Sequence, residues 1–148
     1  MNKYEINPKH KDSFNSFVFN IKEYFYKNEH TIHKARNELK IITHNDIDTV
    51  VKSFKVPNIF NQFIYAFFRD SKAKKSFDYS LKIKDFTPDP IAFIEFHTFF
   101  LLKESYFISK KFDYDFTIRE PLLDNNFSDK EDIFKAFARF TLELHNNN

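Results

Sequence analysis

The 148-residue sequence contains no cysteine, no glycine and no tryptophan. Without cysteine, the chain has no disulfide, no thiolate metal site and no thiol nucleophile. Without glycine, it has no P-loop, no G-x-G-x-x-G dinucleotide fingerprint, no G-x-S-x-G nucleophile elbow and no EF-hand loop. Backbone positions that need a positive φ must therefore be filled by Asn and Asp, the next most tolerant residue types.

Long apolar runs and a strong charge imbalance are also missing. No apolar stretch approaches the ~20 residues that a membrane-spanning helix needs, and the N-terminus lacks the apolar core of a signal peptide. The chain has 23 Lys and Arg against 21 Asp and Glu, a formal net charge of +2. This balance does not indicate a nucleic-acid-binding surface. We therefore predict a cytoplasmic protein with no nucleic-acid partner.

Phenylalanine, by contrast, is abundant, with 22 residues in a chain that is 42% hydrophobic. This apolar content is sufficient for the core of one domain of ordinary size. The simpler interpretation of the phenylalanines is an aromatic core favoured by codon bias. The alternative is an aromatic platform on which bases stack.

Apolar residues recur at the three-and-four spacing of amphipathic helices in four segments. Ser71 and Ser128 are suitable N-cap residues for two of these helices. The third helix must end before Thr87-Pro88-Asp89-Pro90, because each proline disfavours the α conformation of the preceding residue. The predicted helices cover residues 12–25, 58–68, 71 to a point before 87, and 128–144.

Short runs rich in β-branched and aromatic residues predict strands between these helices. Arg36-Asn37 and Asn45-Asp46 are turn residues that separate the first three strands into an antiparallel meander. The predicted strands cover residues 30–34, 39–43, 49–54, 91–96 and 105–112. The order of elements predicts an α+β fold, a five-stranded antiparallel sheet with packed helices and a C-terminal helix.

Lys52 is the first candidate for chemistry, because it lies in the third predicted strand. A lysine that faces inward from a strand is costly to bury without an anionic partner. Asp78, on the helix that begins near Ser71, is a candidate partner. The simpler alternative is a lysine whose ammonium group reaches solvent from the edge of the sheet.

Two further sets of residues have both a functional and a simple structural interpretation. The basic cluster Arg69, Lys72, Lys74 and Lys75 could bind phosphates, nucleic acid or a membrane, or could form a solvated helix flank. The six histidines show no pair at the helical i, i+4 spacing of a metal site, so we predict no metal ligands.

Five segments taken in order resemble the lipopolysaccharide kinase family, which phosphorylates heptose or 3-deoxy-manno-octulosonic acid of the lipopolysaccharide core and has a protein-kinase-like fold. The resemblance covers residues 13 to 145. The segments are KARNE at 34–38, VVKSFKVPN at 50–58, RDSKAKKSFDY at 69–79, TPDPIA at 87–92 and AFARF at 136–140.

The resemblance implies an ATP site. Lys52 matches the strand lysine that contacts the phosphates, and Asp78 falls where the family usually has the helix glutamate that pairs with that lysine. Arg36 and Asn37 lie in the turn that covers the phosphates, where the family often has glycine. Residues 109–115 match the hinge whose backbone holds the adenine.

The resemblance also implies how the chain is divided and what it binds. We expect an N-terminal helical extension at 1–28, a kinase-like N-lobe at 29–120, and a linker with the first helix of a truncated second lobe at 121–148. ATP and Mg²⁺ are the expected cofactors of the intact enzyme. Its expected partners are a lipopolysaccharide core sugar and, by peripheral contact, the inner face of the inner membrane. The catalytic Asp and the metal ligands would follow residue 148, so no catalytic residue is predicted here.

The function predicted from the sequence is thus the nucleotide-binding lobe of a core sugar kinase. The alternative is a non-catalytic module that keeps the shape of the lobe for contact with a partner. In either case the last helix lacks the second lobe as a cover. The apolar residues Phe137, Phe140 and Leu144 therefore predict self-association.

Overall fold

The computed structural model describes residues 2–55 and 70–146. The chain forms two compact units, Met1–Lys111 and Phe112–Asn148. The predicted helix over residues 58–68 lies outside the described residues. The first unit contains all the strands described below.

The first unit is an antiparallel sheet of six strands in the order β1-β5-β6-β4-β3-β2. The strands are β1 (Lys3–Ile6), β2 (Thr31–Lys34), β3 (Asn37–His44), β4 (Ile47–Phe54), β5 (Pro90–Thr98) and β6 (Leu101–Lys110). The predicted α+β class and the antiparallel sheet are confirmed. The predicted count of five strands is wrong, because β1 adds a sixth by pairing with β5.

The edge strand β1, Lys-Tyr-Glu-Ile, alternates polar and apolar residues, but over only four residues. Three of its four residues are exposed, and only Ile6 is buried. Its position is fixed by pairing with β5, in which Tyr4 lies opposite Ile94. Short polar edge strands of this kind are common in natural sheets.

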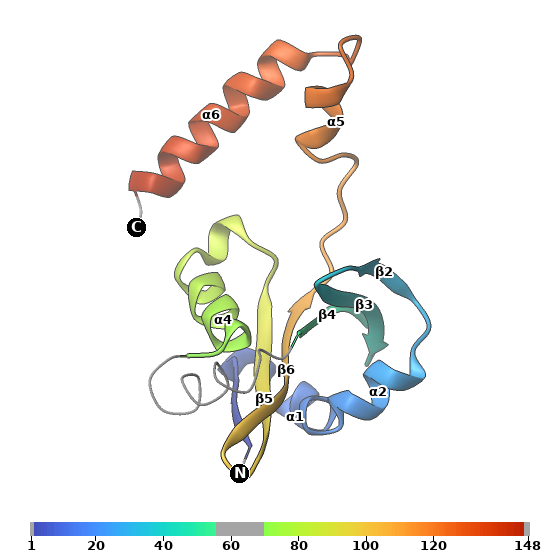
Figure 1. Ribbon diagram of the computed structural model, residues 1–148. Coiled ribbons are helices and arrows are strands. Elements are labelled where there is room, and N and C mark those ends of the chain that lie inside the picture. The colour runs from blue at the N-terminus through green and yellow to red at the C-terminus, as the bar shows by residue number, and fades with distance from the viewer. Residues whose placement is uncertain (1, 56–69, 147–148) are drawn as a thin grey trace. The chain divides into compact units, whose positions relative to one another are not determined.

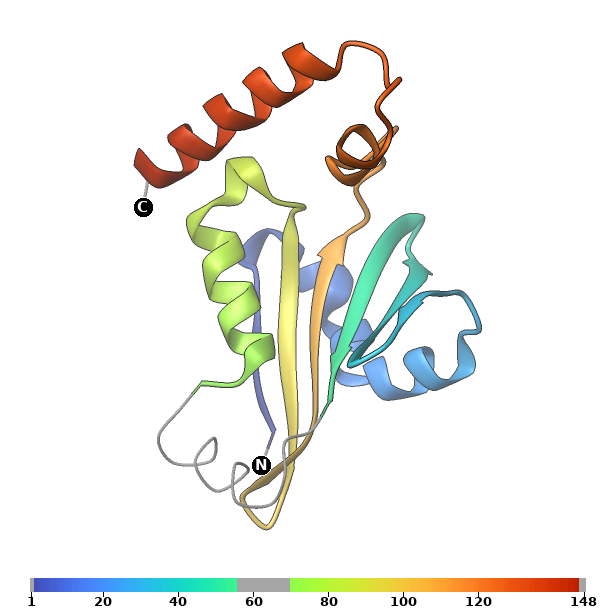
Figure 2. The same ribbon diagram turned by 45° about the horizontal axis from the view of Figure 1, so that its top comes forward.

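Helices cover both faces of the sheet (Figures 1 and 2). On one face lie the short 3-10 helix η1 (Pro8–His10), α1 (Lys11–Phe19) and α2 (Ile21–Lys27). On the other face α4 (Lys72–Lys82) packs on β5 and β6 and is followed by the 3-10 helix η2 (Lys84–Phe86). Successive side chains of β5 point to opposite faces of the sheet, because side chains alternate along a strand.

Each face has its own aromatic core. The larger core, under α1 and α2, includes Phe14, Phe17, Phe25, Val51, Ile94, Tyr106 and Ile108. The smaller core, under α4, consists of Phe54, Ala73, Phe77 and Phe93, with Phe107 packed against it. Six phenylalanines therefore lie within these two cores and Phe96 and Phe107 pack against them, in line with the simpler interpretation of the composition. Others, among them Phe99, Phe100 and Phe112, are exposed.

The predicted helix over residues 12–25 is in fact two helices, α1 and α2, separated at Asn20. Asn20 has φ −99° and ψ 13°, outside the regular helical values. Its side-chain amide donates to the Ser16 carbonyl at 2.9 Å. An asparagine side chain competes in this way with the backbone ladder of a helix, which is why the break occurs here.

The start of α4 confirms the predicted cap, because the Ser71 hydroxyl accepts a hydrogen bond from the Lys74 amide at 3.1 Å. The turns confirm the expectation for a chain without glycine at Asn45, Asp46 and Asp129, which all have φ between 48° and 58°. Two other residues with positive φ, Phe99 and Phe100, were not expected.

The second unit contains α5 (Arg119–Leu123) and α6 (Lys130–Asn146). The described part of α6 contains no buried residue, and Phe137 and Phe140 are 47% and 39% exposed. Self-association through this helix stays a prediction. Among the described residues, none of the helices is both long and apolar enough to cross a bilayer.

Candidate functional site

Lys52 lies in the middle of β4, between the two strands that flank it. It is opposite Leu39 of β3 and Phe107 of β6. Phe54, two residues further along β4, belongs to the core under α4, so Lys52 faces the same side of the sheet as α4. The Lys52 ammonium lies 5.1 Å from the centre of the Phe54 ring. Lys52 is half-buried, and in the described part of the chain no carboxylate lies within 4.0 Å of it.

Asp78 does not form a direct ion pair with Lys52 in the described part of the chain. Its carboxylate lies instead 2.5 Å from the ammonium of Lys74, one helical turn earlier on α4. Asp70 lies 3.7 Å from the same ammonium. The hydrogen bond to Asp78 raises the pKa of Lys74, and attraction by Asp70 and by Glu5 of β1 adds to this effect.

Lys74 and Asp78 lie on one flank of α4. Ala73 and Phe77 define the face of α4 that contacts the sheet. Positions 74 and 78 each follow one of these residues and therefore share one flank of the helix. The opposite flank carries Ser76 and Ser80.

Arg36 lies in the turn between β2 and β3, as the sequence predicts, and is exposed. Asn37, predicted as a turn residue, is instead the first residue of β3, opposite Phe54 of β4. The side-chain oxygen of Asn37 accepts a hydrogen bond from the Lys55 amide at 3.4 Å. The structure therefore brings Asn37 and Lys52 to one face of the sheet, next to the turn that contains Arg36, and pairs Asp78 with Lys74 rather than directly with Lys52.

The segment predicted as the hinge begins within β6 and ends in the second unit. Ser109 is buried, opposite Val50 of β4. The Lys110 and Lys111 amides donate to the carbonyls of Asp89 and Asp48, at 2.9 Å and 2.8 Å. The predicted strand 105–112 is thus too long by two residues at this end, since β6 ends at Lys110.

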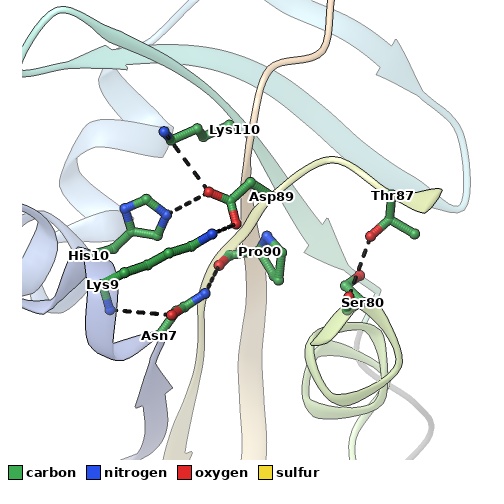
Figure 3. Close-up of polar contacts among 8 residues, drawn as sticks. All are labelled: Asn7, Lys9, His10, Ser80, Thr87, Asp89, Pro90 and Lys110. Atoms are coloured by element: carbon green, nitrogen blue, oxygen red, sulfur yellow. Dashed lines mark hydrogen bonds and ion pairs between the residues drawn. The ribbon is translucent and has the colours of Figure 1, made fainter. Parts of the chain in front are cut away.

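An ion cluster that sequence reasoning missed surrounds Asp89, at the start of β5 (Figure 3). The Asp89 carboxylate contacts Lys9 at 2.6 Å, His10 at 2.8 Å and Lys110 at 3.9 Å. Burial raises the pKa of Asp89, but the hydrogen bonds from Lys9 and His10 outweigh it and hold that pKa below its usual value. Nearby, the Asn7 amide donates to the Pro90 carbonyl at 2.9 Å.

The Asp89 cluster has a structural role, because its contacts connect separate elements of the fold. It joins η1, β5 and the end of β6, the strand from which the predicted hinge leaves. The sequence marks Asp89 only as part of a proline-rich helix break. The residue that it contacts most closely, Lys9, is remote in sequence, and no local spacing signals the contact.

The lysine that the structure buries deeply on a strand is Lys40 on β3, not Lys52. Lys40 is 8% exposed, and its ammonium donates to the carbonyls of Phe25 and Asn28 at 2.8 Å and 2.7 Å. A cation suits this position, because the carbonyls at a helix C-terminus carry partial negative charge. Lys40 therefore fixes the end of α2 to the sheet.

The second buried charged group that the sequence did not single out is the Glu95–His97 pair on β5. The two side chains are 6% and 7% exposed, and a carboxylate oxygen of Glu95 lies 3.5 Å from His97 Nε2. Burial lowers the pKa of His97, against the attraction of Glu95. Residues 2–55 and 70–146 include no group of three or more His, Asp or Glu side chains that could hold a metal ion.

A hollow of about 590 Å³ lies on the other face of the sheet, between α2 and β3. Glu23 and Lys27 in its lining pair with each other at 2.7 Å. Their charges neutralise one another, so the hollow has no net charge from this pair to attract a phosphate.

Comparison of the chain with protein-family models, with curated proteins and with solved structures gives no match. The fold and the site therefore define the class. The described residues form an α+β protein with a six-stranded antiparallel sheet and helices on both faces. On the face that α4 covers, Lys52 has no carboxylate in direct contact among these residues.

Proposed function

We propose that this chain is the nucleotide-binding lobe of a kinase-like phosphotransferase that uses ATP to phosphorylate a lipopolysaccharide core sugar, heptose or 3-deoxy-manno-octulosonic acid. The observation that carries the proposal is the position of Lys52, half-buried on the α4 side of β4 and without a carboxylate in direct contact among the described residues. The sugar acceptor follows from the family resemblance of the sequence.

The order of elements supports a nucleotide lobe. A three-stranded meander with the lysine on its third strand is followed by a helix, a two-stranded hairpin and a connecting segment. This is the order that the resemblance implies. The strand β6 pairs with β4, so the segment that would hold the adenine leaves the sheet beside the lysine-bearing strand.

The register supports a nucleotide bound along β4. Lys52 lies opposite Phe107, three residues before Lys110 at the end of β6. At about 3.3 Å per residue, the lysine and the start of the connecting segment are roughly 10 Å apart along the strands. An adenine at residues 109–111, the part of the predicted hinge that lies in the first unit, would direct its phosphates along β4 toward Lys52 and toward Arg36 and Asn37.

The charged residues near Lys52 are better suited to binding a phosphate group than to binding a metal ion. A lysine without a direct carboxylate partner is a good ligand for a phosphate oxygen. The described residues offer no cluster of acids for Mg²⁺, so we assign no Mg²⁺ ligand in this part of the chain. Mg²⁺ would assist the transfer of the phosphoryl group when it is bound by the intact enzyme.

A second candidate function is a non-catalytic lobe that binds a nucleotide or a partner without phosphoryl transfer. The pairing of Asp78 with Lys74 favours it, because active protein kinases use the helix acid to hold the strand lysine. In this candidate, Asp78 stabilises α4 and has no role at the nucleotide.

Replacement of Lys52 by alanine tests the proposal. We expect the affinity of the chain for a fluorescent ATP analogue to fall about tenfold, because a hydrogen bond between charged groups contributes roughly 1.5–3 kcal/mol. The matched control is Lys103→Ala, an exposed lysine of β6 at the end remote from the connecting segment, which should leave the affinity unchanged. Equal affinities for the wild-type chain and Lys52→Ala would contradict the proposal.

The variant Asp78→Asn separates the two candidates. If nucleotide binding draws Asp78 toward Lys52, as the kinase mechanism requires, Asp78→Asn weakens binding of the analogue severalfold. If Asp78 only stabilises α4, the variant lowers the unfolding midpoint slightly and leaves the affinity intact.

A further inference from the structure

The turn between β5 and β6 consists of two phenylalanines in a conformation that phenylalanine disfavours. Phe99 and Phe100 have φ of 48° and 66°, and the turn is a two-residue connection in which Thr98 pairs with Leu101. Two positive φ values in succession are typical of hairpin turns made by Asn-Gly or Asp-Gly. Bulky residues are rare in this region because Cβ approaches the neighbouring carbonyl oxygen.

The lack of glycine does not force this choice. The turn between β3 and β4 has the same two positive φ values, and there the chain uses Asn45 and Asp46. The β5–β6 turn could be built from the same residue types. Strain that is kept where an unstrained alternative exists indicates that the side chains themselves are needed.

Both rings of this turn, which we call the aromatic tip (Phe99 and Phe100), face solvent. Their exposed fractions are 91% and 77%. The aromatic tip lies at the end of the sheet away from the point where the chain leaves β6 (Figures 1 and 2). At about 3.3 Å per residue, the 10 residues of β6 place the tip roughly 30 Å from Lys110, where the chain leaves the sheet beside the proposed nucleotide site.

The charged side chains around the aromatic tip favour anionic partners. Lys103 on β6 and Lys3 on β1 are exposed. The two acids of the β5–β6 hairpin itself are not available as free surface charge, because Glu95 is 4% exposed and Glu104 is held by Lys22 at 2.5 Å. Glu5 of β1 is exposed, two residues farther along β1 than Lys3 and opposite Phe93.

An exposed tyrosine lies farther from the aromatic tip. Tyr26 is 69% exposed, and its hydroxyl donates at 3.2 Å to Glu104, four residues after Phe100 on β6. Exposed phenylalanines with lysine and tyrosine farther along the strands are an arrangement of side chains that anchors proteins at a membrane–water interface.

We propose that the aromatic tip inserts into the surface of a bilayer that contains anionic lipid. Phe99 and Phe100 enter the boundary between headgroups and acyl chains, while Lys3 and Lys103 contact lipid phosphates. A bilayer suits this surface better than a protein groove, because the tip is a convex turn whose nearest exposed charge on the hairpin is the cation of Lys103, three residues after Phe100. The inference does not depend on the proposed nucleotide site.

Such an anchor is weak and reversible. Two phenyl rings bury little apolar area compared with a lipid chain, so the electrostatic attraction must contribute. Binding should therefore need anionic lipid and should weaken as salt is raised, because exposed charges are screened.

Vesicle flotation of the full chain tests the proposal, with phosphatidylcholine vesicles prepared with and without phosphatidylglycerol. We expect binding to the anionic vesicles and at least tenfold weaker binding to phosphatidylcholine alone. The double replacement of Phe99 by Asn and Phe100 by Gly should reduce binding to the anionic vesicles at least tenfold, and Lys103→Ala should reduce it severalfold. Lys52→Ala should bind as the wild-type chain does.

The absence of tryptophan from the chain allows a direct measurement of insertion. In Phe100→Trp the only tryptophan is at the tip, and its emission should shift to shorter wavelength with anionic vesicles. The matched control is Tyr79→Trp on α4, at a position that is 59% exposed, whose emission should not shift. The proposal is overturned if the emission of Phe100→Trp does not shift, or if the Asn-Gly variant binds the vesicles as well as the wild-type chain does. The alternative partner of the tip is then an apolar pocket on another protein.

Discussion

Replacing Phe77 by alanine is expected to lower the free energy of unfolding by about 3–5 kcal/mol, because truncation of a fully buried aromatic residue leaves a cavity. Phe77 is 0% exposed, and its ring lies 5.6 Å from that of Phe93 on β5. Ala73 and Phe77 are the buried hydrophobic residues of α4. The loss of Phe77 therefore removes most of the apolar contact that holds α4 on the sheet.

Urea unfolding followed by circular dichroism measures this effect. A domain of this size has a total stability of about 5–15 kcal/mol, so the variant should be only marginally folded at room temperature. Tyr79→Ala is the matched control, since Tyr79 lies on the solvent side of the same helix and its replacement should change the stability by less than about 0.5 kcal/mol. Similar losses in the two variants would show that α4 is not fixed by its buried face.

Replacing Phe99-Phe100 by Asn-Gly is expected to raise the free energy of unfolding by about 2 kcal/mol, contrary to the usual effect of a mutation. Each bulky residue in the left-handed region costs roughly 1–2 kcal/mol, and Asn-Gly adopts this turn without that cost. Little packing is lost, because both rings are largely exposed.

Thermal unfolding with a second variant separates strain from ring contacts. Phe99→Ala with Phe100→Ala removes both rings but keeps two Cβ atoms at positive φ, so its midpoint should stay close to that of the wild-type chain. The Asn-Gly variant should melt several degrees higher. An equal midpoint for all three chains would mean that the turn is not strained. If the Asn-Gly variant is more stable and no longer binds vesicles, the two phenylalanines lower the stability of the chain but are needed for its membrane binding.

The sheet was largely predictable because its strands carry their own local signals. The strands β3 and β4 are runs rich in β-branched residues, and Asn45-Asp46 forms the tight turn between them as the residue types indicate. The cap of α4 was equally local, because Ser71 needs only the amide three residues later. The edge strand β1 is too short, at four residues, to give a distinctive signal and is fixed by pairing with β5.

The details of the candidate site depend on contacts that a sequence does not encode locally. Helical spacing places Asp78 on α4, but only the structure shows that its carboxylate pairs with Lys74 of the same helix rather than directly with Lys52. Strand periodicity singles out Lys52 as costly to bury, but the deeply buried lysine is Lys40, at the end of α2. The Asp89 cluster joins segments distant in sequence, and no spacing rule connects them.

The most direct test of the proposed nucleotide lobe is a nuclear magnetic resonance titration of the isotope-labelled chain with ATP. We predict that amide shifts change at Lys52, at the turn of Arg36 and Asn37, and along residues 109–115. In Lys52→Ala the changes near the turn should disappear, and those along 109–115 should remain. Changes confined to the hollow between α2 and β3, or a pattern that Lys52→Ala leaves intact, would contradict a nucleotide site on the α4 side of β4.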